Sequence, residues 1–223
     1  MARDMYGPMT GASAWMMTPR WDAPHLALLW AMWAVMMTGM MLPSAGPMIL
    51  LAGVAAPDPD RRTWARHTYP LTLGYLVVWA LFSVGATALQ WGLAQILALT
   101  PMMEVSSRRA GAVFLFMAGL YQVTPWKQAC LNACQSPLAF LMGRWRSGVW
   151  GAFRTGVEHG AYCLGCCWAL MLLLFAGGVM NLTVIAALTA FVSFEKIAAA
   201  GVQSARVSGA LLVAAAAWMI FGT

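Results

Sequence analysis

The sequence EHGAYCLGCCWALM, from Glu158 to Met171, decides how the rest of the chain is organised. It opens a long apolar segment and contains one histidine and three of the five cysteines: His159, Cys163, Cys166 and Cys167. At about 100° per residue, these four side chains fall within roughly a 100° arc of one helix. The sequence therefore predicts an apolar helix with one face that carries thiols and an imidazole.

The composition is that of a membrane protein. Of the 223 residues, 61% are hydrophobic and only 9% are charged, whereas a soluble domain has roughly 25% charged residues. Since a spanning helix needs about 20 apolar residues, there is room for about six spans. We expect an all-α, polytopic transmembrane helix bundle of about six spans with a short interfacial helix. Residues 1–24 would form a polar or interfacial tail, and residues 25–223 a single bundle domain.

The apolar runs set the expected boundaries of the spans. We expect these at about 25–55, 70–99, 110–123, 156–180, 182–199 and 207–221. Pro43 and Pro47 fall in the first span, and a proline removes a backbone donor, so a kink or break is expected near Pro43. His67 falls in the polar loop 57–69 and is interpreted as a solvated loop residue.

The connection at 124–155 is predicted to hold the short interfacial helix. Its helical pattern carries Cys130 and Cys134 one turn apart, and Ser136-Pro137 interrupts it. Lys127 and the neighbouring tryptophans and arginines are expected to anchor this helix at the membrane surface.

Basic residues are distributed unequally between the two sides of the expected bundle. Lys and Arg are more frequent in the loops after the first, third and fifth spans, which the positive-inside rule places in the cytoplasm. We expect a multi-pass protein of the bacterial inner membrane with its thiols near the reducing cytoplasmic face. The net charge of +6 then reflects orientation, and no nucleic-acid partner is expected. The first 24 residues show no cleavable signal peptide, and an outward amino end suggests a natural form with one more upstream span.

Two pairs of soft ligands share a four-residue spacing, which places each pair on one face of a helix. Cys130 with Cys134 and His159 with Cys163 could close a tetrahedral site between two helices. Such ligands suit zinc, cuprous copper or an iron–sulfur centre. The alternative is that the cysteines are small buried hydrophobes. The predicted metal ligands, with two substitute or extra thiols included, are Cys130, Cys134, His159, Cys163, Cys166 and Cys167.

Other residues are candidates for auxiliary roles. A methionine stripe in the first span presents soft thioethers, although methionine also serves as adaptable packing. Glu158 could orient His159, or it could extend to water. Glu195-Lys196 is either a functional intramembrane pair or an anchor of a helix end. The auxiliary candidates are Met32, Met36, Met40, Glu158, Met171, Glu195 and Lys196.

Three stretches together resemble a bacterial family of predicted metal-binding integral membrane proteins, the domain of unknown function 2182. They are residues 32–45, residues 121–137 with YQVTPWK at their start, and residues 159–168, HGAYCLGCCW. The resemblance covers most of the chain, and that family has a similar pair at Glu195-Lys196. Members usually begin with a further hydrophobic segment, from which this chain departs. The resemblance implies metal binding in a multispan bundle and leaves the activity open.

We therefore expect a membrane protein that binds a soft transition metal ion, with copper favoured over zinc, for metal delivery, sensing or translocation. Its expected partners are the lipid bilayer and a metal chaperone or membrane complex. Two alternatives stay open: a membrane redox enzyme or electron-transfer subunit with a metal or thiol centre, and a metal-free assembly subunit. The sequence contains no phosphate loop, nucleophile elbow or dinucleotide fingerprint, so ATP-driven transport by this chain alone is not expected. Whether the protein is an enzyme stays open, with a non-enzymatic role favoured.

Overall fold

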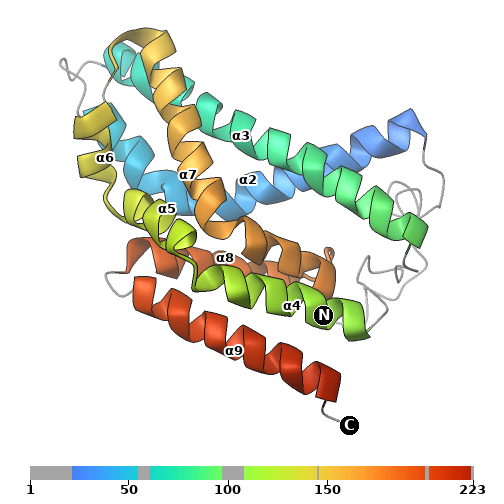
Figure 1. Ribbon diagram of the computed structural model, residues 1–223. Helices are drawn as coiled ribbons and strands as arrows, with labels where there is room; N and C mark the ends of the chain where they lie inside the picture. The colour runs from blue at the N-terminus through green and yellow to red at the C-terminus, as the bar shows by residue number, and fades with distance from the viewer. Residues whose placement is uncertain (1–21, 55–60, 97–107, 145, 199–200, 222–223) are drawn as a thin grey trace.

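The computed structural model describes residues 22–54, 61–96, 108–144, 146–198 and 201–221 (Figure 1). These residues form eight helices and no strand, which confirms the all-α prediction. Most of the predicted N-terminal tail lies outside the described residues. The helices are α2 (Ala23–Val54), α3 (Arg61–Ile96), α4 (Arg108–Gln122), α5 (Pro125–Gln135), α6 (Pro137–Arg144), α7 (Gly148–Gly177), α8 (Leu182–Ile197) and α9 (Gly201–Phe221).

Of the described helices, four are long and apolar enough to cross a membrane: α2, α3, α7 and α9. The predicted six spans are not confirmed, because α4 has only 15 residues and α8 only 16. At 1.5 Å per residue such helices are about 22–24 Å long, less than the roughly 30 Å of a hydrocarbon core. The two short helices therefore pack against the long ones without matching their length.

Several predicted boundaries are corrected by the structure. α3 begins at Arg61, so His67 is helical and the predicted loop is shorter. α7 begins at Gly148, well before the expected start at residue 156. α2 continues through Pro43 and Pro47, so the helix is not broken there, and the predicted kink stays a prediction. The Met41 carbonyl, near Pro43, accepts hydrogen bonds from the Ser44 hydroxyl of the same helix and from the Tyr75 hydroxyl of α3.

α7 lies at the centre of the bundle and contacts α3, α4, α5 and α8 (Figure 1). α3 and α7 approach closely because both carry glycine at the crossing. A β-carbon at Gly156 would lie 1.9 Å from the Leu71 carbonyl oxygen, and one at Gly74 would lie 2.1 Å from the Phe153 carbonyl oxygen. Small residues allow such backbone contact in membrane helices. This crossing fixes the cysteine-bearing part of α7 against α3.

The cysteine face of α7 is part of the apolar core. Cys163, Cys166 and Cys167 are 1–2% exposed and belong to the largest buried cluster. The same cluster contains Trp33 of α2, whose ring lies 5.1 Å from that of Phe175. The predicted ligands of α7 are therefore enclosed by protein.

Candidate metal centre

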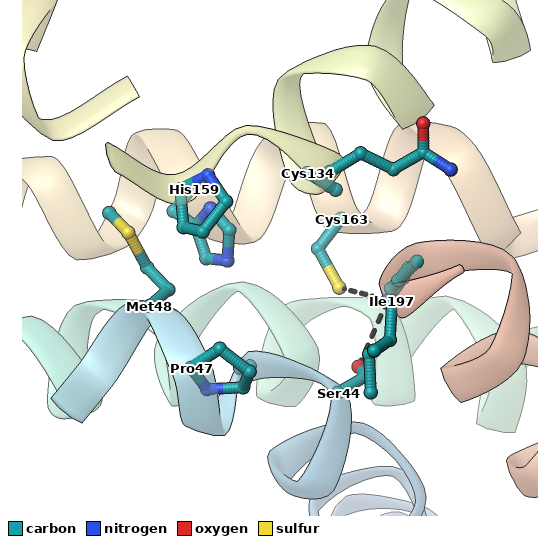
Figure 2. A pocket seen from close by; sticks show the side chains of 11 residues that line it. Ser44, Pro47, Met48, Cys134, His159, Cys163 and Ile197 are labelled. Atoms are coloured by element: carbon teal, nitrogen blue, oxygen red, sulfur yellow. Dashed lines mark hydrogen bonds between the residues drawn. The ribbon is translucent and has the colours of Figure 1, made fainter. Parts of the chain in front are cut away.

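A pocket of about 130 Å³ lies where α2, α5, α6, α7 and α8 meet (Figure 2). It brings together three of the six predicted ligands, two from α7 and one from α5. The residues that line it are Ser44, Ala45, Pro47, Met48, Cys134, Gln135, Pro137, His159, Cys163, Lys196 and Ile197. We refer to it as the α5/α7 pocket.

His159 contributes an imidazole that is almost fully enclosed. Its side chain is 3% exposed, and its Nδ1 atom has no hydrogen-bond partner among the described residues. The ring stacks on Tyr75 at 5.8 Å between centroids and meets Phe140 edge-to-face at 5.4 Å. A buried nitrogen without a partner costs free energy, so it requires an explanation. A bound metal ion would provide one.

Cys163 lies one helical turn after His159 and carries the most contacted thiol of the pocket. Its Sγ atom is 3.0 Å from the Tyr75 hydroxyl and 2.8 Å from the Lys196 ammonium. Both neighbours come from other helices, α3 and α8. The sequence did not indicate Tyr75, because a single tyrosine in an apolar helix carries no pattern of its own.

The remaining thiols of α7 continue the sulfur-rich region away from the pocket. The Cys166 and Cys167 thiols donate to the Cys163 carbonyl at 3.1 Å and 2.9 Å. Cys134 of α5 interacts with the Cys166 thiol, and Cys163 with that of Cys167. We call Cys134, Cys163, Cys166 and Cys167 the thiol cluster. The Met41 thioether lies 3.9 Å from the Cys167 sulfur and extends the cluster into α2.

Cys130 is not part of the α5/α7 pocket. Its sulfur lies against the backbone of α7, 2.7 Å from the position of a β-carbon at Gly165. The predicted set of Cys130, Cys134, His159 and Cys163 is thus assembled only in part. Within the described residues, no group of three or more His, Cys, Asp or Glu side chains has the arrangement of a metal site. The donors line a common space rather than converge on one point.

The predicted auxiliary methionines lie elsewhere. Met32, Met36 and Met40 line an apolar groove between α2 and α8, and Met171 is buried in the core. The thioethers nearest the candidate centre are instead those of Met41 and Met48. Met32, Met36 and Met40 therefore do not line the α5/α7 pocket, and their auxiliary role stays a prediction.

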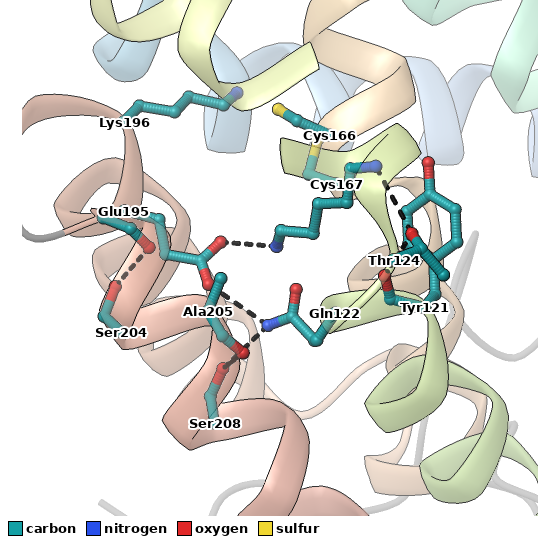
Figure 3. Close-up of polar contacts among 12 residues, drawn as sticks. Tyr121, Gln122, Thr124, Cys166, Cys167, Glu195, Lys196, Ser204, Ala205 and Ser208 are labelled. Carbon is teal, nitrogen blue, oxygen red and sulfur yellow. Dashed lines mark hydrogen bonds and ion pairs between the residues drawn. The ribbon is translucent and has the colours of Figure 1, made fainter. Parts of the chain in front are cut away.

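Glu195 and Lys196 are both buried and have different partners. Glu195 accepts from Lys127 at 2.7 Å and from Gln122 at 3.1 Å, and Gln122 also donates to Ser208 at 2.9 Å (Figure 3). The prediction that Lys127 anchors the membrane surface is wrong, since this side chain is 0% exposed. The network joins α4, α5, α8 and α9, whereas Lys196 extends into the α5/α7 pocket.

Glu158 does not orient His159. Its carboxylate lies 3.1 Å from Arg144 and 3.3 Å from Arg146, on the exposed side of α7. The hydrogen bond to Glu158 raises the pKa of the Arg144 guanidinium. The same guanidinium lies over the rings of Phe140 and Tyr162, at 5.5 Å and 5.1 Å from their centroids.

Comparison with known proteins finds a matching protein family. A family model described as PpoB2, copper chaperone, matches residues 30–219. No curated protein and no solved structure matches the chain. The matched region contains the α5/α7 pocket and the thiol cluster, and it covers most of the sequence. The match supports a relation to copper, which is the more general part of the resemblance described above. On this evidence the chain belongs to the PpoB2 copper chaperone family.

Proposed function

We propose that this protein binds cuprous copper in the α5/α7 pocket, within a membrane, and holds it for delivery to a partner. The observation that carries the proposal is the position of His159. Its buried Nδ1 atom lacks a hydrogen-bond partner among the described residues, and its side chain shares one pocket with two thiols. The copper chaperone family supports copper as the metal.

The donor set suits cuprous copper. Thiolates and thioethers are soft ligands that favour Cu(I), and imidazole is also a common copper ligand. We assign the ligand roles to Cys134, His159 and Cys163, which would move together by side-chain rotation to bind one ion. The neighbouring thioether of Met48 favours Cu(I) over zinc. Cys130 is left out because it lies against Gly165, outside the pocket.

The rest of the thiol cluster would allow copper to move. Cys166 and Cys167 are adjacent to the proposed ligands but are not among the pocket residues. A Cu(I) ion can exchange one thiolate for a neighbouring one without changing its oxidation state. We propose that the cluster passes copper along α7 by such ligand exchange. Four helices with the length and apolarity to cross a bilayer support a membrane location, for which we propose the bacterial inner membrane.

The test is Cu(I) binding by the detergent-purified protein under anaerobic, reducing conditions, measured by elemental analysis and by competition with a chromophoric chelator. The wild-type protein is expected to bind about one Cu(I) in the pocket. The double variant Cys134→Ser/Cys163→Ser is expected to lose affinity by about 100-fold or more, because even residues that only orient a ligand change metal affinity by about 10- to 100-fold. Cys130→Ser is the matched control, with the same substitution one turn away on α5, and should bind as the wild type does.

Two results would contradict the proposal. One is a wild-type protein that binds no Cu(I) under these conditions, which would favour the metal-free assembly subunit. The other is an equal loss in Cys130→Ser and in the double variant. The redox alternative is separated by cycling the loaded protein between oxidant and reductant: a handling site keeps copper cuprous or releases it, whereas a redox centre cycles reversibly with the metal retained.

A further inference from the structure

Lys196 places a cation beside the proposed copper ligands. Its side chain is 5% exposed, and its Nζ atom lies 2.8 Å from the Cys163 sulfur and 3.2 Å from the Ser44 hydroxyl. The Met41 sulfur is 3.8 Å away. An ionisable side chain enclosed by apolar helices is costly and indicates a functional role.

The other buried charges nearby already neutralise each other. Glu195, the neighbour of Lys196, forms its ion pair with Lys127. The ion pairs among the described residues do not include one between Lys196 and a carboxylate. The thiol cluster is therefore the group beside Lys196 that can become negatively charged, when its thiols lose protons.

We propose that Lys196 makes the α5/α7 pocket selective for monovalent over divalent metal ions, an inference that rests on the proposed function. When Cu(I) binds, the thiols of Cys134 and Cys163 release two protons to solvent and become thiolates, and no electron is transferred. One monovalent ion with two thiolates and a neutral imidazole carries a single negative charge. The Lys196 ammonium brings the pocket to neutrality.

A divalent ion upsets this balance. Zn²⁺ with the same two thiolates and imidazole is neutral, so the Lys196 charge remains uncompensated. An uncompensated charge in a low-dielectric interior is strongly unfavourable. Lys196 thus acts by its charge and position and is not a ligand. Ser44 offers the ammonium a second acceptor at 3.2 Å, so it can remain in the pocket when Cys163 binds metal.

The test compares Lys196→Met with the wild type in Cu(I) and Zn(II) affinity, each measured by chelator competition in the same detergent. A neighbouring unit charge changes the stability of a charged group by about 10- to 1,000-fold. The wild-type preference for Cu(I) is expected to fall by at least tenfold in Lys196→Met and to be retained in Lys196→Arg. The control is Lys127→Met/Glu195→Gln, which removes a balanced pair and should leave the preference unchanged.

A second measurement on the wild-type protein covers the case in which Lys196→Met does not fold. Ag(I) and Cd(II) are both soft metal ions but differ in charge. The affinity of the protein for each ion is divided by the affinity of free dithiothreitol for the same ion. The protein is expected to favour Ag(I) by at least tenfold on this scale. An equal preference, or an unchanged Cu(I)/Zn(II) ratio in a folded Lys196→Met, overturns the charge-selectivity inference while copper binding stands. A wild type that binds no Cu(I) overturns the proposed function itself.

Discussion

The ammonium of Lys127 lies 2.7 Å from the carboxylate of Glu195, and both side chains are buried in the bundle. Lys127 belongs to α5 and Glu195 to α8, so the ion pair joins two short helices that are distant in sequence. These helices also carry Cys134 and Lys196, which line the α5/α7 pocket. The ion pair therefore helps to hold the two sides of the pocket together.

Glu195→Gln leaves Lys127 as an uncompensated buried cation. Breaking a buried pair from one side costs about 3–5 kcal/mol, and the free energy of unfolding in mixed micelles is expected to fall by about that much. Tryptophan fluorescence during denaturation measures this change. Lys127→Met/Glu195→Gln should recover most of the loss, because it removes both charges. A single variant as stable as the wild type would show that the pair contributes little.

Gly74→Ala tests the crossing of α3 and α7. The new β-carbon would lie 2.1 Å from the Phe153 carbonyl oxygen, which is backbone and cannot move aside cheaply. Overpacking of this kind costs about 1–3 kcal/mol. Gly85→Ala on the same helix is the matched control, since no atom lies within 4 Å of its β-carbon. We expect that control to be neutral or stabilising by up to about 1 kcal/mol, and equal effects of the two variants would contradict the crossing.

His159→Phe separates packing from metal binding. A phenyl ring can retain the contacts with Tyr75 and Phe140 but offers no nitrogen to a metal. Thermal stability without copper should therefore change little, while Cu(I) affinity falls by at least about tenfold, the lower end of losses at metal sites. Unchanged affinity in a folded His159→Phe would remove His159 from the ligand set.

The two cysteines of α5 should respond differently to copper. Both residues are partly exposed, and the labelling of each thiol by maleimide is compared with its own labelling without copper. Cu(I) is expected to protect Cys134, a proposed ligand, and to leave Cys130 reactive. Peptide mass spectrometry after brief labelling, with and without one equivalent of Cu(I), measures the modification of each thiol. Equal protection of both cysteines would place Cys130 in the site.

Glu158→Gln provides a contrast with the buried pair. Its partners Arg144 and Arg146 are each 43% exposed, and exposed ion pairs contribute about 0–1 kcal/mol. We expect a loss of stability below about 1 kcal/mol, measured by the same denaturation assay, and no change in Cu(I) affinity. A large fall in copper affinity would instead support the prediction that Glu158 orients His159.

The helices could be predicted from the sequence because long apolar runs and the proline at residue 137 mark them clearly. Their ends could not, since α3 and α7 continue through charged residues such as Arg66 and Arg154 that composition assigns to loops. Whether a helix can cross a membrane also depends on its length. That length is hard to read from the sequence where apolar and polar residues are mixed near the ends of a helix. All-α architecture was thus accessible, and the span count was not.

The candidate site, too, could be predicted from the sequence only in part. The spacing of His159 and Cys163 placed both on one face of α7 correctly. The spacing of Cys130 and Cys134 is identical, so only the packing of α5 on Gly165 decides which thiol lines the pocket. Tyr75 and Lys127 were missed as interior polar groups because their partners lie 88 and 68 residues away in the chain.

The shortness of α4 and α8 has a consequence for the surrounding lipid. Because both helices are about 22–24 Å long, a bilayer that matches α2 and α7 is too thick beside them. Acyl chains there must shorten or disorder, at a cost of a fraction of a kcal/mol per ångström of hydrophobic mismatch. Since α8 carries Lys196, we expect acyl-chain length to influence the proposed copper binding through this helix. Vesicles of short-chain and long-chain phospholipids are expected to differ in how readily the protein takes up copper.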